Sequence, residues 1–143
     1  MDKYNFQEKA IQNIINDYSE NSNGRGLVVI PTGGGKTLTA IRTVNQLIIN
    51  GTLSINDCVL WVTHLKTLLY QTRSVAENKN WAKKFNFHKD LNSILKIEMK
   101  DSALSLMREQ KNVKIIIIDE AHHSSANTYK KFFSYSTPYI IGL

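Results

Sequence analysis

Residues 31–37 combine glycines with a lysine and a threonine in an order suited to binding a phosphate chain. Consecutive glycines leave no Cβ to keep the backbone N–H groups away from a negative charge. The ammonium of Lys36 can then reach the β- and γ-phosphates of a nucleoside triphosphate, and the Thr37 hydroxyl can ligate Mg²⁺. The loop residues that we expect to contact the nucleotide are Thr32, Gly33, Gly34 and Gly35.

A pair of adjacent carboxylates, Asp119 and Glu120, supplies the complementary chemistry. Mg²⁺ takes few protein carboxylates and keeps several waters, so Asp119 is suited to hold it through its water shell. Glu120 is placed to orient and deprotonate a water that attacks the terminal phosphate. Together with the lysine loop, this pair predicts a site that binds a nucleoside triphosphate with Mg²⁺ and hydrolyses it.

The elements around both segments indicate an α/β fold with a mainly parallel sheet. The apolar run 27–30 reads as a strand that leads into the glycine loop, and residues 36–49 read as the helix after it. Residues 113–118 are almost all β-branched, which is typical of a strand buried on both faces, and Asp119 follows its carboxyl end. Ligands of open α/β sheets bind at that edge. The loop and the carboxylates are therefore expected to meet there.

The rest of the chain alternates between strand and helix patterns. Strand runs are expected from Val59 onward and over 139–143, and helical spacing is expected in three further segments, 7–18, 65–75 and 102–108. Residues 77–90 mix aromatic residues with lysines and could pack on the sheet edge or reach towards a partner; we favour packing. The alternation predicts βαβ units in one domain.

Composition limits the remaining possibilities. The chain has 143 residues, 42% of them apolar, which is enough for one core. Its net charge is +6, but the basic residues are scattered, so we expect only weak, salt-sensitive binding to nucleic acid from charge alone. Cys58 is the single cysteine and reads as an inert, packed thiol. The sequence shows neither a signal peptide nor a membrane-spanning run, so a cytoplasmic location is expected.

Four motifs resemble those of the superfamily 2 helicases and translocases of the DEAH-box type. Residues 30–37 are similar to motif I, the P-loop or Walker A motif, although Ile30 replaces the first glycine of the general pattern. Residues 119–122 are similar to motif II. Residues 6–11 resemble the aromatic-glutamine pattern, and residues 59–64 resemble motif Ia. Within that superfamily, the chain most resembles the helicase-like subunits of restriction enzymes.

The resemblance implies a three-layer RecA-like domain that uses ATP and Mg²⁺. It implies that Gln7 reads the adenine and that His122 links the nucleotide site to motif III and a second domain. It also implies that the region after residue 59 contacts nucleic acid, which we expect to be DNA rather than RNA. The residues to which these roles are assigned are Lys36, Glu120 and His122 for catalysis, and His64, Lys66 and Arg73 for nucleic-acid contact.

Residues 139–143 resemble the strand that leads into motif III, so residues 1–143 are expected to form the first of the two RecA-like domains of such a motor. The family's arginine finger comes from the second domain, and such a finger contributes roughly 10³- to 10⁵-fold to the rate of phosphoryl transfer. We therefore expect this chain alone to bind ATP weakly and to hydrolyse it negligibly.

Two other classes of function fit parts of the sequence. One is another P-loop ATPase, such as an AAA-type remodeller of proteins; the Pro-Thr-Gly loop and Gln7 count against it. The other is a stand-alone module that binds ATP or nucleic acid without hydrolysis. Stimulation of the ATPase by duplex nucleic acid favours the motor, stimulation by peptide favours the remodeller, and binding without turnover favours the module.

Overall fold

The computed structural model describes residues 3–20, 35–109, 112–119 and 139–143, with side chains from residue 7 onward. The expected strand 27–30 and the expected contacts of several motif residues lie outside these ranges. Those residues are Thr32, Gly33, Gly34, Glu120 and His122. The fold and the site below are built from the described residues.

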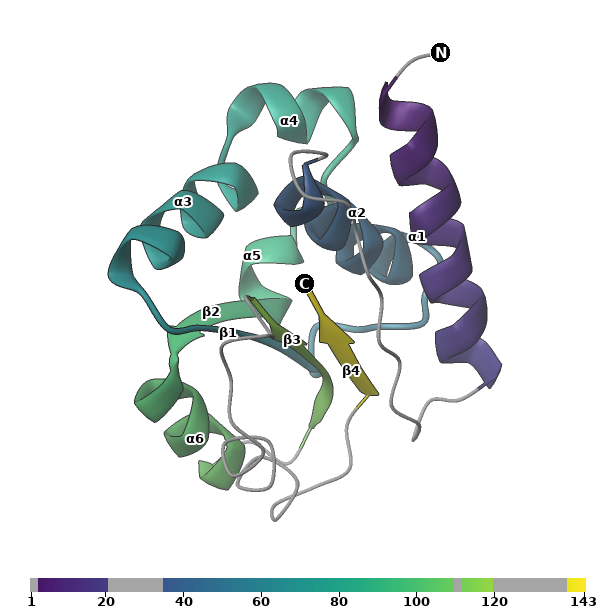
Figure 1. The fold of residues 1–143 in the computed structure, drawn as a ribbon. Helices are drawn as coiled ribbons and strands as arrows, with labels where there is room; N and C mark the ends of the chain where they lie inside the picture. Colours follow the sequence, from purple (N-terminus) through teal and green to yellow (C-terminus); the bar gives the residue numbers. More distant parts are fainter. Residues whose placement is uncertain (1–2, 21–34, 110–111, 120–138) are drawn as a thin grey trace.

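The described helices and strands form three layers (Figure 1). The elements are α1 (Lys3–Glu20), α2 (Lys36–Ile49), β1 (Cys58–Thr63), α3 (Lys66–Ala76), α4 (Lys79–Lys84), α5 (Leu91–Ile94), β2 (Leu95–Met99), α6 (Lys100–Glu109), β3 (Val113–Ile118) and β4 (Tyr139–Gly142). The expected helix 36–49 is confirmed at both ends, and the other three expected helices are each found within four residues of their predicted bounds.

The strands form one sheet in the order β2-β1-β3-β4, and every pair in the described residues is parallel. This arrangement confirms the expected α/β fold with a parallel sheet. Strand β2 was not predicted from the sequence. Its first four residues alternate between buried and partly exposed, but β2 joins α5 and α6 with no intervening loop residue.

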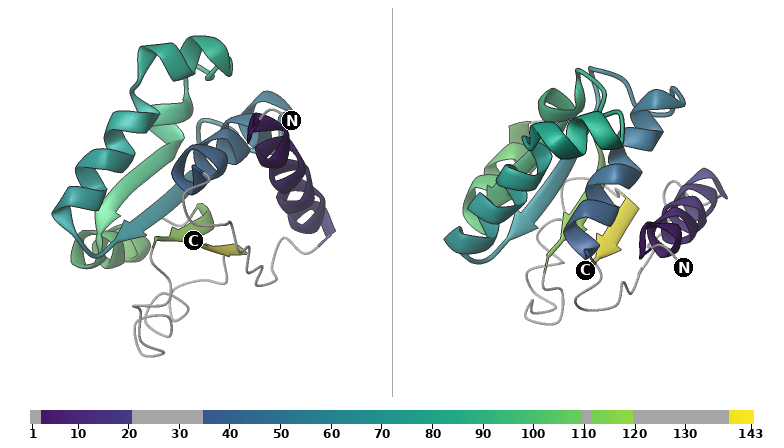
Figure 2. Two further views of the ribbon diagram at one scale, coloured as in Figure 1. Left: turned by 45° about the horizontal axis from the view of Figure 1, so that its top comes forward. Right: turned by 90° about the horizontal axis from the view of Figure 1, so that it is seen from above.

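The two faces of the sheet carry separate cores because successive side chains in a strand point to opposite faces. Alternate residues of β1 and β3, such as Trp61 and Ile117, pack with α1, α2, α3 and α5. The residues between them, such as Leu60 and Ile116, pack with α6. Figure 2 shows the longer helices on one side of the sheet and α6 on the other. The sheet is therefore the middle layer.

Residues 77–90 pack against the helical layer rather than on the sheet edge that we favoured. The side chain of Asn45 in α2 donates hydrogen bonds to the carbonyls of Phe85 and Asn86, at 3.4 and 3.2 Å, and accepts one from the His88 N–H at 2.6 Å. Asn86 has a φ of 54° and turns the chain there. A single buried amide on α2 thus holds the turn after α4.

Cys58 lies at the start of β1 and is buried, as expected of a packed thiol. Burial raises the pKa of its thiol to about 11, because desolvation disfavours the thiolate. The thiol therefore stays protonated and unreactive near neutral pH. No helix in the described ranges is long and apolar enough to cross a membrane.

Replacement of Ile117 by alanine tests the central position of β3. Ile117 is fully buried in the core beneath α2, so Ile117→Ala is expected to lower the free energy of unfolding by about 2–5 kcal/mol. Ile55 is 54% exposed and is the matched control, so Ile55→Ala is expected to change the free energy of unfolding by less than about 0.5 kcal/mol. Urea titration of both variants measures their free energies of unfolding, and equal losses would contradict the assigned core.

Candidate nucleotide-binding site

Gly35 forms the turn that leads into α2. It adopts φ 72° and ψ 43°, the left-handed conformation that favours glycine. Its carbonyl accepts hydrogen bonds from the N–H and the hydroxyl of Thr39, at 2.9 and 3.0 Å. The last glycine of the predicted loop is thereby held in one conformation at the helix N-terminus.

Lys36 and Thr37 are the first two residues of α2, and both are partly exposed. The first turn of the helix contains no acidic residue, so nothing on it neutralises the partial positive charge of the helix N-terminus. Backbone N–H groups, a lysine and a hydroxyl therefore occur together at one electropositive point. A phosphate group is the ligand that the sequence predicts for this turn, and it stays a prediction.

Asp119 continues β3 by one residue at its carboxyl end. Its N–H donates to the Val62 carbonyl at 3.0 Å, so it remains in the ladder beside the end of β1. Only 4% of Asp119 is exposed, a degree of burial that carboxylates rarely show unless cations or hydrogen-bond donors face them. Ile117, two residues earlier, packs beneath α2, so the strand period directs the Asp119 side chain to the same face.

The N-terminus of α2 and the edge of the sheet formed by the carboxyl ends of its strands lie on the same side of the domain. In Figures 1 and 2, the first turn of α2 lies towards the carboxyl end of β4, where the described chain ends. The Leu143 N–H donates to the Ile118 carbonyl at 3.0 Å, which places the ends of β3 and β4 side by side. The structure thus brings Lys36, Thr37 and Asp119 to one edge.

Gln7 lies beside the glycine turn, although it comes from α1. Only 4% of the residue is exposed, and its Nε2 would lie 3.0 Å from a Cβ added to Gly35. Its Oε1 accepts a hydrogen bond of 3.0 Å from Nη1 of Arg42. The glutamine that the resemblance assigned to adenine is therefore fixed next to the loop that the sequence assigned to phosphate.

Besides Gln7, Arg42 contacts a second residue of α1 and a residue in the turn after α4. Its Nη2 donates to the carboxylate of Glu8 in α1, and its guanidinium carbon lies 3.9 Å from the centre of the Phe85 ring. The residue is 7% exposed. The sequence analysis did not single out Arg42, because its partners are 34, 35 and 43 positions away in the chain and no local pattern marks it.

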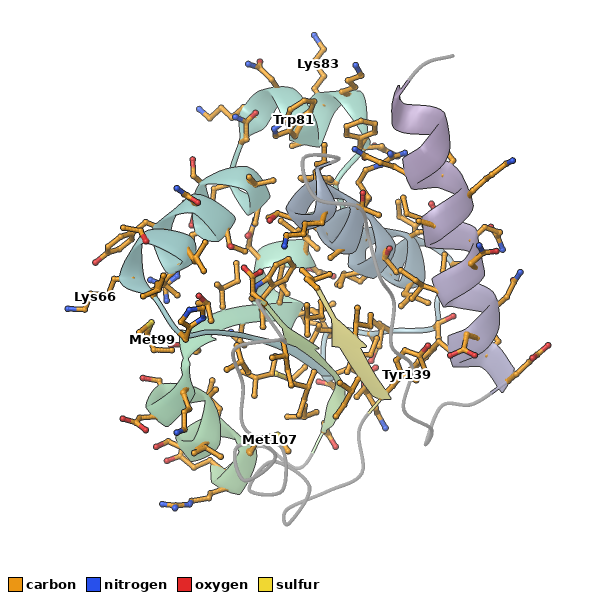
Figure 3. All side chains as sticks on the ribbon, in the orientation of Figure 1. Lys66, Trp81, Lys83, Met99, Met107 and Tyr139 are labelled. Atoms are coloured by element: carbon orange, nitrogen blue, oxygen red, sulfur yellow. The ribbon has the colours of Figure 1, made fainter. Side chains whose placement is uncertain are left out.

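The three residues expected to contact nucleic acid lie after β1, in two different settings. His64 and Lys66 are exposed, and Figure 3 shows the Lys66 side chain extending away from the start of α3. Arg73 instead donates to the Ile97 carbonyl at 2.9 Å and lies 3.8 Å from the carboxylate of Glu98. Its guanidinium is therefore already bonded to residues of β2. Lys66 is consequently the better residue with which to test this surface.

A cleft of about 470 Å³ lies between α1, α2 and the turn after α4. Arg42, Phe85 and Asn45 line it, whereas Gly35, Lys36 and Thr37 do not. The cleft is therefore separate from the predicted phosphate-binding turn.

Comparison with known proteins identifies the fold. The family model described as "Type III restriction enzyme, res subunit" matches residues 1–143. No curated protein sequence matches the chain at a significant level. Among solved structures, the UvsW helicase from bacteriophage T4 aligns with a TM-score of 0.66 and 12% identity, over 96% of this chain and 51% of that one.

A second structure gives the same TM-score of 0.66, with 19% identity, over 96% of this chain and 17% of that one. It is a nuclease-deletion mutant of the type ISP restriction-modification enzyme LlaGI in complex with a DNA substrate mimic. These alignments confirm the expected helicase RecA-like fold. The chain spans about half of the first structure's length and about a sixth of the second's.

Replacement of Gly35 by alanine tests the close approach of Gln7 to the turn. A left-handed alanine costs about 1–2 kcal/mol, and here its Cβ would also meet Nε2 of Gln7. Gly51 is the matched control, since its φ is 84° and no atom lies within 4 Å of an added Cβ. Urea titration is expected to show a loss for both variants, and a larger one for Gly35→Ala. Equal losses would mean that Gln7 does not constrain the turn.

Proposed function

The chain belongs to the family of type III restriction enzyme res subunits, and we propose that it is the ATP-binding motor domain of a nucleic-acid helicase or translocase. The observation that carries this proposal is the meeting of three elements at one edge of the sheet. The glycine turn and lysine of α2, the buried Asp119 after β3 and Gln7 of α1 converge there. Each supplies a different part of nucleotide recognition.

In this proposal Lys36 and the N–H groups at the start of α2 hold the β- and γ-phosphates. Thr37 and Asp119 would hold Mg²⁺, for which their hard oxygen donors are suited. When bound, Mg²⁺ neutralises charge on the phosphates. Glu120 follows Asp119 in the chain and would take the proton of the attacking water. Gln7 would read the base, and His122 would transmit the state of the γ-phosphate to a second domain.

We propose that residues 1–143 act as one of two halves of the motor. The chain covers 51% of the UvsW chain and 17% of the LlaGI chain, so both of those proteins contain much more than this domain. A charge that stabilises the transferring phosphoryl group is supplied in the family by the second domain. Hydrolysis by these residues alone would then be slower by roughly 10³- to 10⁵-fold.

DNA is the nucleic acid that we propose as partner. The LlaGI structure was solved with a DNA substrate mimic, and the family is named after restriction enzymes. Exposed His64 and Lys66 lie at the carboxyl end of β1, at the same edge as Asp119. If DNA binds at this edge, a conformational change that depends on the bound nucleotide would be transmitted directly to the DNA contacts.

The nucleotide site is tested by Lys36→Ala. Loss of a charge-assisted bond to phosphate is expected to raise the dissociation constant for Mg²⁺-ATP by about tenfold to a hundredfold. Lys100 is the matched control, because it begins α6 as Lys36 begins α2, but on the other face of the sheet. Calorimetric titration should find Lys100→Ala unchanged. Equal effects of the two substitutions would contradict the site.

The DNA contact is tested by Lys66→Ala. Loss of one phosphate contact is expected to weaken duplex binding and to reduce the slope of log K against log salt by about one. Lys83 is the control, since it is also exposed but lies on α4, far from Lys66 in Figure 3. Fluorescence anisotropy between about 50 and 200 mM salt measures both variants. An unchanged slope for Lys66→Ala would rule out this contact.

A further inference from the structure

Arg42 is the point at which three separate segments meet. Its side chain is 8% exposed and contacts Gln7 and Glu8 of α1 as well as the Phe85 ring after α4. A buried guanidinium needs such partners, because its desolvation is costly. Of these contacts, only the bond to Gln7 leads to a residue that lies beside the glycine turn.

The bond between Arg42 and Gln7 determines which way the Gln7 amide faces. A guanidinium carries only hydrogen-bond donors, so the amide atom opposite Nη1 must be the oxygen. A flipped amide would place its NH₂ group against these donors and lose the bond. The Nε2 end therefore stays directed towards Gly35.

We propose that Arg42 is a positioning residue that makes the site prefer ATP to GTP by preventing the Gln7 amide from flipping. The inference rests on the proposed function, in which Gln7 faces the base. Arg42 does not touch the nucleotide in this scheme. It acts through the orientation of another side chain.

The chemistry of the purine edges explains the preference. Adenine presents an acceptor, N7, beside a donor, the 6-amino group, whereas guanine presents two acceptors, N7 and O6. An amide held in one orientation presents one N–H donor beside one carbonyl acceptor. It can pair with both adenine groups and with only one guanine group. Holding the amide therefore favours adenine without improving the binding of guanine.

Phe85 and Glu8 have different parts in this arrangement. The Phe85 ring lies 3.9 Å from the guanidinium carbon and forms a flat surface that fixes its plane. The turn that carries Phe85 is itself tied to α2 by Asn45. Glu8 binds the other end of the guanidinium, but 63% of its side chain is exposed, so its bond competes with water.

The test compares the dissociation constants of Mg²⁺-ATP, Mg²⁺-GTP and Mg²⁺-7-deaza-ATP for the full chain and its variants by calorimetric titration. Arg42→Met removes the donors and keeps a long apolar stem. It is expected to weaken ATP binding about three- to tenfold, the range for ordering one long side chain on binding, with GTP binding unchanged. The wild-type chain should also bind 7-deaza-ATP, which lacks the N7 acceptor, more weakly than ATP. That difference should shrink in Arg42→Met.

Two further variants keep the test independent of folding defects. Phe85→Leu retains Arg42 but removes the flat surface, so the ratio of ATP to GTP affinity should fall in the same direction. Glu8→Ala removes a partner of the same guanidinium without touching the bond to Gln7, so the ratio should stay as in the wild type. Circular dichroism and thermal unfolding identify any variant that fails to fold.

Gln7→Ala separates the failure of this inference from the failure of the proposed function. A ratio that falls in Gln7→Ala but not in folded Arg42→Met and Phe85→Leu would overturn the role of Arg42 and leave Gln7 as the reader of the base. A ratio unchanged in Gln7→Ala would overturn both roles. The phosphate site would still be tested separately by Lys36→Ala.

Discussion

Parallel pairing of the four strands is the constraint on which the candidate site depends. In a parallel sheet all carboxyl ends lie at one edge, so the chain after β1, β3 and β4 emerges at one place. The two-residue period of β3 then decides which face each side chain takes. Had the register slipped by one residue, Asp119 would face α6 and Ile116 would face α2. Burial of the isoleucines fixes the register of β3. It therefore also fixes the face of the sheet to which the Asp119 carboxylate points.

Helix α1 adds a second constraint, because contacts hold it near both of its ends. Gln7 and Glu8 bind Arg42 of α2, while Asp17 accepts a hydrogen bond from the Tyr139 hydroxyl of β4. The Tyr18 and Tyr139 rings also meet edge to face, with centres 5.2 Å apart. Burial and the bond to Asp17 raise the pKa of Tyr139, so the hydroxyl remains a donor at physiological pH. The helix therefore connects the glycine turn to the strand expected to lead into motif III.

Local pattern was sufficient for the features that depend on neighbouring residues. The bounds of α2 and β3 follow from helical spacing and from a nearly unbroken β-branched run, and both are as predicted. The edge strand β2 was missed because α5, β2 and α6 follow one another directly, so no turn residue separates their patterns. The turn at Phe85 was misplaced for a different reason. Its position depends on Asn45, some forty residues earlier, and a lone asparagine in a helix gives no sign that it is buried.

The same distinction applies to the site. Lys36, Thr37 and Asp119 could be proposed as site residues because a phosphate loop and a strand-end carboxylate have local spacing that carries chemical meaning. No such local spacing marks Arg42, which reads in the sequence as one more charged residue on an amphipathic helix. Its burial arises only when α1 packs on α2 and the turn after α4 closes over them. A residue proposed to touch the ligand can be predicted from its type and spacing, whereas a residue proposed to orient such a group depends on contacts that only the folded chain creates.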